Sequence, residues 1–368
     1  NLVGEAGVGK SALISTLKAV PAMSRVRLVE GSALAIGKNL SFHPLIDMLK
    51  NWAGIGEDDG PAESVGKLEK ATRALGPDGL EEIFPFVATL MGFSVAGRPA
   101  ERLKGIEGEA LEKLILKSLR ELLQKTARAR PLVVILEDLH WADLTSIRFL
   151  ESVFRLAEDN PILFLNVFRP GYQETGGRLF DAVRARYGRI AVDIALEPLS
   201  RAESETLISN LLKLGAVPAA ARSLIVERTE GNPFFIEEVL RSFIDDGVIE
   251  IKDGAFLVTD RIHAAIIPET VQELLMVRID RLDEGSRSLL KVAAVIGRSF
   301  LRSVLAAVAD SGPGIELQLD ELKDSQLIRE RQSGDEIEGL FKHALVQEVA
   351  YESILPAKRR EIHRRIAQ

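Results

Sequence analysis

The chain has 368 residues, of which 46% are hydrophobic and 27% are charged, a globular balance that excludes wholesale disorder and low-complexity sequence. Because single cores rarely grow beyond about 250 to 300 residues, this length predicts two or three folded units. The 47 basic and 54 acidic residues give a formal net charge of −7, which excludes the overall basic character of a typical nucleic-acid-binding protein.

The first half of the chain alternates short β-rich runs with helical patterns. Strands are predicted at residues 2–3, 26–30, 132–136, 162–168 and 190–195. Helices are predicted at residues 10–20, 44–53, 107–128, 145–157 and 179–186, with a loop-rich helical insertion at 54–100. Strands that alternate with helices form parallel sheets, so we predict a five-stranded parallel sheet. Only Leu2 and Val3 precede the first glycine turn, so we expect a truncated first strand within a longer protein.

The second half changes to helices with few strands. Helices are predicted at residues 201–213, 218–229 and 233–246, followed by a hairpin of 248–251 and 256–258 around Asp253 and Gly254. Further helices are predicted at 269–282, 285–296, 301–309 and 315–325, then two strands at 327–331 and 336–341 around Ser333 and Gly334. Helices followed by two short strands are typical of a winged-helix unit. We therefore expect a core at 1–197, a helical domain at 198–247, a winged-helix-like domain at 248–342 and C-terminal helices at 343–368.

The sequence contains no cysteine and no run of about 18 apolar residues that could span a bilayer. The absence of cysteine excludes disulfide bonds and thiolate metal sites and favours a reducing compartment. The absence of a long apolar run predicts that the protein has no membrane partner. We expect a cytoplasmic protein.

The strongest local motif is a glycine-rich turn between the first strand and the first helix. Residues 4–11 fit the pattern glycine, four residues, glycine, lysine and serine, in which backbone N–H groups and a helix N-terminus bind phosphate oxygens. Lys10 can bridge the outer phosphates and Ser11 can offer a hydroxyl to Mg²⁺. The predicted nucleotide-binding residues are Gly4, Glu5, Ala6, Gly7, Val8, Gly9, Lys10, Ser11 and Ala12.

Two acidic residues, Glu137 and Asp138, end a buried strand at the edge of the sheet where ligands collect. We assign Glu137 to Mg²⁺ and Asp138 to polarising the attacking water. The usual order places aspartate first, which leaves catalysis an open point, and an acidic strand end without metal is the alternative. Arg169 follows the strand 162–168 and could pair with a γ-phosphate, or it could be a surface arginine.

Other polar residues give weaker signals. From the residues alone, Gly231, Asn232 and Pro233 are interpreted as helix-capping residues. The five histidines are not spaced as a metal cluster, and His140 with Trp141 could pack in the loop after the acids. The basic residues near the C-terminus are interpreted as a solvated helix face.

Taken together, these motifs resemble the STAND class of signal-transducing NTPases, which is related to AAA+ ATPases. The resemblance rests on residues 4–11, 132–143, 196–199 and 230–235 and spans nearly the whole chain. Residues 341–351 with 359–363 are similar to the ATPase region behind class III adenylate/guanylate cyclase domains.

The resemblance implies an α/β P-loop NTPase core followed by a helical domain and a winged-helix domain. It implies that the strand before Arg169 lies between the glycine-loop strand and the acidic strand. It also implies that Pro233 contacts the adenine region and that His343 contacts the β-phosphate of ADP. Family members commonly carry an effector domain on one side and helical repeats on the other, so both are expected in cis.

The function expected from the sequence is a regulatory switch that binds ATP or ADP with Mg²⁺ and hydrolyses ATP slowly. Its catalytic residues would be Lys10, Asp138 and Arg169. The alternatives are a nucleotide-binding scaffold without turnover, and a transcriptional regulator or kinase-associated module of the same class. Direct DNA binding is disfavoured because the predicted helix 301–309 carries only Arg302 as a cation.

Overall fold

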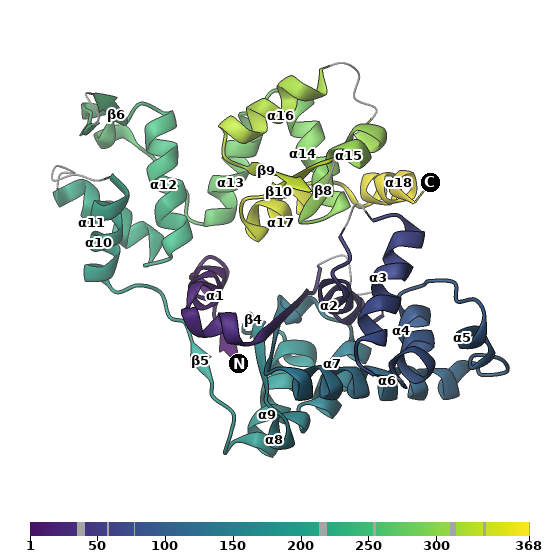
Figure 1. The fold of residues 1–368 in the computed structure, drawn as a ribbon. Helices are drawn as coiled ribbons and strands as arrows, with labels where there is room; N and C mark the ends of the chain where they lie inside the picture. The colour runs from purple at the N-terminus through teal and green to yellow at the C-terminus, as the bar shows by residue number, and fades with distance from the viewer. Residues whose placement is uncertain are drawn as a thin grey trace. The chain divides into compact units, whose positions relative to one another are not determined.

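The chain folds into two compact units, shown in the computed structural model of Figure 1. The structure describes residues 1–34, 41–56, 59–76, 78–212, 219–252, 255–309, 314–333 and 336–367. Unit 1 consists of Asn1–Gly4 and Lys10–Ala195, and unit 2 consists of Glu5–Gly9 and Leu196–Gln368. By its contacts, most of the glycine-rich turn therefore groups with unit 2. The finer domain limits given above stay predictions.

Unit 1 contains a five-stranded parallel sheet in the order β2-β3-β4-β1-β5, which confirms the predicted α/β P-loop class. The strands are β1 (Leu2–Val3), β2 (Arg27–Ser32), β3 (Leu132–Glu137), β4 (Ile162–Phe168) and β5 (Ile194–Ala195). Strand β4 lies between β1 and β3, as the resemblance implied. The predicted strand 190–195 was too long, because β5 pairs only with Leu2 and Val3 of β1.

The centre of the sheet forms because β3 and β4 carry largely apolar runs. Five successive residues of β3, Leu132 to Leu136, are buried, as expected for a strand covered on both faces. The connecting helices are α1 (Lys10–Ala19), α2 (His43–Ala53), α6 (Gly108–Ala129), α7 (Leu144–Val153), α8 (Leu156–Asp159) and α9 (Arg178–Tyr187). The single helix predicted at 145–157 was wrong, because turn residues 154 and 155 separate α7 from α8.

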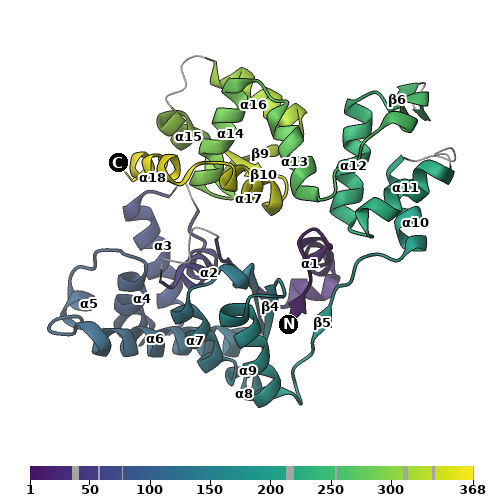
Figure 2. The same ribbon diagram turned by 180° about the vertical axis from the view of Figure 1, so that it is seen from behind.

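A group of helices lies between α2 and α6 in the chain. It consists of α3 (Pro61–Arg73), a π-helix (Gly79–Ile83), α4 (Phe84–Leu90) and α5 (Arg98–Glu101). These helices pack on one another and α4 packs on α6, as Figures 1 and 2 show. Fully buried leucines such as Leu68, Leu119 and Leu122 belong to the same hydrophobic core as β3.

Unit 2 begins with helices α10 (Arg201–Leu212), α11 (Ala219–Thr229) and α12 (Pro233–Asp245). An antiparallel hairpin of β6 (Ile249–Lys252) and β7 (Ala255–Val258) follows, which confirms the predicted hairpin, although Asp253 and Gly254 lie outside the described residues. Asn232 is the N-cap of α12, because its side chain accepts a hydrogen bond from the backbone of Phe235.

The rest of unit 2 combines helices with a small sheet. The helices are α13 (Val271–Asp280), α14 (Glu284–Ile296), α15 (Arg302–Ala309), α16 (Ile315–Asp324), α17 (Ala344–Glu352) and α18 (Pro356–Ile366). Antiparallel strands lie in the order β8 (Ser299–Leu301), β10 (Glu336–Phe341), β9 (Ile328–Ser333). The two predicted strands are confirmed, but their turn at Gly334 lies outside the described residues and β8 was not predicted. The winged-helix class of this region stays a prediction.

Strand β8, which was not predicted, packs closely on its neighbour in the small sheet. Phe300 of β8 is buried and its ring lies directly over Gly339 of β10. A Cβ atom at residue 339 would come within 2.2 Å of that ring, so only glycine fits there. The sequence shows an isolated glycine in a strand but does not identify the ring that faces it.

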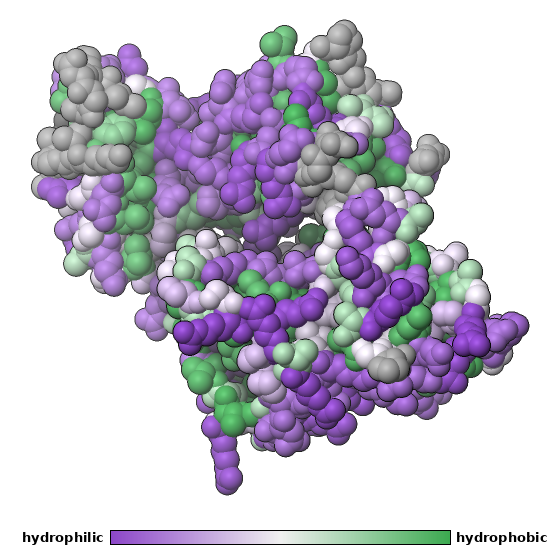
Figure 3. Space-filling view, in the orientation of Figure 1, coloured by the Kyte–Doolittle hydropathy of each residue, from purple (hydrophilic) through white to green (hydrophobic). Residues whose placement is uncertain are grey.

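The surface is mostly hydrophilic on the face drawn in Figure 3, with apolar residues in smaller groups. Among the described residues, no helix is both long and apolar enough to cross a lipid bilayer.

Candidate functional site

The glycine-rich turn joins β1 to α1. Gly7 and Gly9 have φ values of +81° and +106°, a region of backbone conformation that favours glycine. Lys10 is the first residue of α1, is only 9% exposed, and donates from Nζ to the carbonyl of Gly4 at 2.8 Å. The turn thus folds back over the N-terminus of a ten-residue helix, where the helix dipole favours an anion.

The two acids lie at the carboxyl end of β3, also in unit 1. Ser11 Oγ donates to Glu137 Oε2 at 3.3 Å, so the second residue of α1 and the last residue of β3 meet. Both Glu137 and Asp138 are half-buried. Asp138 has a left-handed backbone, with φ of +57°, and its carbonyl accepts from Trp141 at 2.8 Å. A non-glycine residue in that conformation is uncommon and is held here by the turn that follows.

Arg169 directly follows β4, which lies between the glycine-loop strand and the acidic strand. Parallel strands end at the same edge of their sheet, so Arg169 begins at the same edge as Gly4 and Glu137. Its side chain is half-buried.

An aromatic cluster supports the loop after the acids. The His140 ring is fully buried and lies 5.1 Å from the Trp141 ring and 4.9 Å from the Tyr172 ring, measured between centroids. The backbone carbonyl of His140 accepts from Thr175 Oγ1 at 3.1 Å. The prediction that His140 and Trp141 pack in this loop is confirmed. Tyr172 was missed, because nothing in the sequence pairs it with residues about thirty positions earlier.

Asp143 is a second residue that sequence reasoning left without a role. It caps α7 by accepting from the backbone of Ser146 at 2.9 Å, and its other oxygen accepts from the backbone of Phe42 at 3.0 Å. It is 7% exposed. An aspartate just before a helical pattern is a capping signal that the sequence does contain.

In unit 2, the glycine turn contacts the start of α12. Asn232 Nδ2 donates to the carbonyl of Ala6 at 2.9 Å, and the backbone N–H of Phe234 donates to the carbonyl of Gly7 at 3.3 Å. Pro233 is the first residue of α12 and is half-buried. The interpretation of Pro233 as a helix-start proline is confirmed, but nothing in the sequence signals the contact of this segment with the glycine turn.

His343 lies next to the same helix start. Its ring centroid is 4.1 Å from that of Phe234. Burial, and then the nearby cations Lys342, Arg241, Arg298 and Arg329, lower the pKa of His343 to about 4. The imidazole is therefore neutral at neutral pH, in an environment of excess positive charge that suits an anion.

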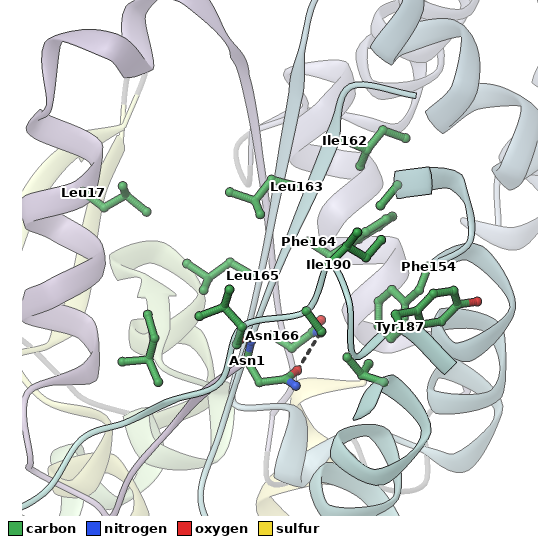
Figure 4. A pocket seen from close by; sticks show the side chains of 15 residues that line it. Asn1, Leu17, Phe154, Ile162, Leu163, Phe164, Leu165, Asn166, Tyr187 and Ile190 are labelled. Atoms are coloured by element: carbon green, nitrogen blue, oxygen red, sulfur yellow. Dashed lines mark hydrogen bonds between the residues drawn. The ribbon is translucent and has the colours of Figure 1, made fainter. Parts of the chain in front are cut away.

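A separate apolar cavity of about 370 Å³ lies in unit 1. Figure 4 shows its side chains, which come from β4, α9 and residues near β5, and the bond of 3.1 Å from Asn166 to Asn1. Glycine-turn and acidic residues do not line it. This cavity is therefore separate from the glycine turn and the acidic strand end.

Comparison with known proteins finds a family similarity for the first part of the chain. The family model described as AAA ATPase domain matches residues 1–165, the part that holds the glycine turn and the acidic strand end. Residues 1–165 are thus similar to AAA ATPase domains. This confirms the resemblance to AAA+-related P-loop NTPases. A second model, for a domain of unknown function (DUF8739), matches residues 200–256.

A longer protein is similar to nearly the whole chain. An uncharacterized protein of Rhizobium meliloti (strain 1021) is 26% identical over 373 residues, covering 99% of this chain and 34% of the relative. The chain thus spans about a third of that relative's length.

Solved structures share low sequence identity with the chain. A STAND protein with a tetratricopeptide-repeat sensor from Pyrococcus horikoshii is 15% identical, with a TM-score of 0.49 over 99% of this chain and 42% of that one. The ORC2 protein of Aeropyrum pernix, in ADPNP-ADP complexes, is 13% identical, with a TM-score of 0.36 over 100% of this chain and 88% of that one.

Proposed function

We propose that the chain is a STAND-type regulatory switch that binds ATP or ADP with Mg²⁺ and hydrolyses ATP slowly. The observation that carries this proposal is the meeting of Ser11 and Glu137, 3.3 Å apart, beside the N-terminus of α1 and the buried Lys10. A hydroxyl, a carboxylate and a lysine in this arrangement are the groups that a P-loop ATPase needs for Mg²⁺ and phosphate.

The phosphate chain binds residues 4–12. Backbone N–H groups and Lys10 hold its oxygens, and the glycines of the turn allow the backbone to approach them closely. Ser11 and Glu137 form an all-oxygen ligand pair, which is the chemistry that Mg²⁺ prefers. When bound, Mg²⁺ neutralises negative charge on the phosphate oxygens.

Hydrolysis is an in-line attack of water on the γ-phosphate. Asp138 orients and polarises the water, and Arg169 stabilises the charge that develops on the phosphate oxygens. The left-handed backbone at Asp138 supports this role, because it turns the chain sharply at the strand end. The first acid of the pair is Glu137, where aspartate is usual, and this difference suits slow turnover.

The switch uses groups of unit 2. Pro233 contacts the adenine region, and His343 with its surrounding cations contacts the β-phosphate of ADP. Nucleotide exchange then changes the packing of unit 2 residues on the glycine turn, and a two-state equilibrium of this kind can be passed to an effector. Support comes from the contacts of Asn232 and Phe234 with that turn.

The effector is a domain in cis, and in one version of the proposal it is a class III nucleotide cyclase. Helical repeats follow downstream, and the protein is cytoplasmic. The length of the Rhizobium meliloti relative supports additional parts in proteins of this kind. Other effectors of the same class, a kinase or a transcriptional domain, differ only in what the switch controls.

The experiment is phosphate release by the chain with Mg²⁺ at high protein concentration. We expect slow but measurable turnover, reduced on the order of 100-fold or more in Asp138→Asn, while ATP affinity stays within about twofold. Asp159→Asn, in the short helix α8, is a matched control that should leave turnover unchanged.

The alternative is a nucleotide-binding scaffold without turnover. It predicts saturable ATP binding with no phosphate release above that of Asp138→Asn. Absence of ATP binding by folded protein would contradict both versions.

A further inference from the structure

Asn232 makes two hydrogen bonds that join two distant parts of the chain. Its Oδ1 accepts from the backbone N–H of Phe235 at 3.2 Å, and its Nδ2 donates to the carbonyl of Ala6 at 2.9 Å. The orientation of the amide is fixed by these partners, because a backbone N–H needs an oxygen and a carbonyl needs a donor. One side chain thus caps α12 and holds the glycine turn.

The turn that carries Asn232 is itself held firmly. Gly231 has a φ of +74°, and its carbonyl accepts from the backbone of Leu199 at 2.8 Å. A Cβ atom at residue 231 would lie 2.1 Å from the Leu199 carbonyl oxygen, so a larger residue cannot fit. Asn232 is therefore presented to the glycine turn from a fixed backbone.

The glycine turn is shaped to receive Asn232. A Cβ atom at Gly7 would lie 2.6 Å from Asn232 Oδ1 and 3.0 Å from Phe234 Cβ. The next glycine, Gly9, also has a positive φ, but a Cβ atom there would meet no atom of the described residues within 4 Å, apart from its chain neighbours. Gly7 thus serves the contact with α12 as well as the local backbone conformation.

The two contacts set the direction of backbone donors in the turn. In a planar trans peptide, the carbonyl and the following N–H point in opposite directions. A carbonyl of Ala6 directed at Asn232 therefore points the N–H of Gly7 away from α12. In the same way, the bond from Phe234 to the carbonyl of Gly7 turns the N–H of Val8 away from α12, and this N–H makes a long contact of 3.5 Å with the Glu5 carbonyl.

We propose that Asn232 is a positioning residue that orients the Gly7 and Val8 N–H groups toward bound phosphate and so couples phosphate binding to the docking of α12 on the glycine turn. This inference rests on the proposed nucleotide binding and adds a residue and a coupling to it. Phosphate binding and the Asn232 contact favour the same conformation of the turn, so each strengthens the other.

The test uses Asn232→Ser, because serine keeps the helix cap but is too short to donate to Ala6. We expect an unchanged melting temperature without nucleotide, ADP binding about two- to tenfold weaker, and faster amide exchange at Gly7 and Val8. The matched control is Thr270→Ser, which changes the cap of α13 in the same unit and should leave ADP affinity and both amides unchanged.

A second variant, Gly7→Ala, blocks the same contact from the other side and should weaken ADP binding at least as much as Asn232→Ser. Wild-type ADP affinity and unchanged amide exchange in Asn232→Ser would overturn the inference and leave the proposed function intact. Failure of the wild-type chain to bind ADP would overturn the proposed function, and with it the phosphate coupling.

Discussion

At the scale of single residues, the hydroxyl of Ser11 carries the assignment of the Mg²⁺ site. It is exposed and lies 3.3 Å from Glu137 Oε2, so its removal takes away one ligand without opening a cavity. In Ser11→Ala we expect ATP binding to lose most of its dependence on Mg²⁺, with little change in the free energy of unfolding. Titrations of ATP with Mg²⁺ and with a chelator measure this.

The control for that variant is Ser15→Ala, which removes an exposed hydroxyl one turn further along α1. It should keep the full Mg²⁺ dependence. Equal Mg²⁺ dependence in both variants would contradict the assignment of Ser11.

His343 predicts a pH dependence of stability. Its pKa is lowered to about 4 in the folded chain from an ordinary value of 6.5, by burial and by neighbouring cations. As pH falls from 6.5 toward 4, the unfolded state takes up this proton first, so the folded state loses stability over that window. The contribution is fully present above pH 6.5.

Urea unfolding at pH 7 and pH 5 measures the effect. We expect the free energy of unfolding to fall more in the wild type than in His343→Gln, since carboxylates shared by both proteins cancel in the comparison. Bound ADP should reduce the difference, because a phosphate near His343 offsets the cations. Equal losses in the two proteins would exclude a depressed pKa at this residue.

The residues proposed to bind phosphate stand out in the sequence because they are consecutive. Residues 4–11 and the pair Glu137 and Asp138 form local patterns in which spacing reflects chemistry. Asn232 could not be predicted in its second role, since its partner Ala6 is 226 positions away. A capping asparagine has the same local pattern whether or not its amide reaches another segment.

At the scale of elements, a buried ion pair joins α12 to α13. Glu238 and Arg278 are 3% and 6% exposed, and Arg278 also donates to the carbonyl of Ser325 at 2.5 Å. Burial, and then the nearby Arg281, lower the pKa of Arg278 to about 10, so it stays charged at neutral pH. Arg278→Met should cost about 3 to 5 kcal/mol, because the buried carboxylate of Glu238 loses this partner and keeps the longer ion pair of 3.7 Å with Arg241.

Chemical denaturation of the protein, followed by a signal from unit 2, measures that cost. The double variant Arg278→Met with Glu238→Leu should recover most of the loss, since it removes both charges. Arg281→Met is the exposed control and should change stability by less than about 1 kcal/mol. If Arg278→Met were as stable as Arg281→Met, the ion pair of Glu238 and Arg278 would not stabilise the contact of α12 with α13.

Element types could be predicted better than element limits. Strand β4 was predicted with its observed bounds because seven residues of one β-rich run form it. Strand β5 was overestimated because a strand requires a partner, and only two residues of β1 pair with it. Strand β8 was missed because three residues give no period, and its packing on Gly339 is a tertiary contact.

At the scale of the whole molecule, the formal net charge of −7 argues against a nucleic-acid-binding role. Helix α15 contains Arg302 as its single cation, and that residue forms an ion pair with Glu316. We expect no salt-sensitive binding of duplex DNA in fluorescence anisotropy at low salt. Binding that weakens steeply as salt rises would contradict this expectation.

The class of the first unit could be predicted because alternation of strands and helices leaves few topologies. The place of β4 between β1 and β3 came from the resemblance and not from periodicity, and the structure has that order. The grouping of Glu5–Gly9 with unit 2 could not be foreseen, because it depends on contacts made across more than two hundred residues.

The most direct test of phosphate binding by the glycine turn is calorimetric titration of the folded chain with ATP and Mg²⁺. We expect saturable binding that weakens about 10- to 100-fold in Lys10→Ala, because a charge-assisted bond to the phosphates is lost. Lys18→Ala, at the other end of α1, should bind as the wild type does. Equal affinity in Lys10→Ala and the wild type, or no ATP binding by either, would contradict the account.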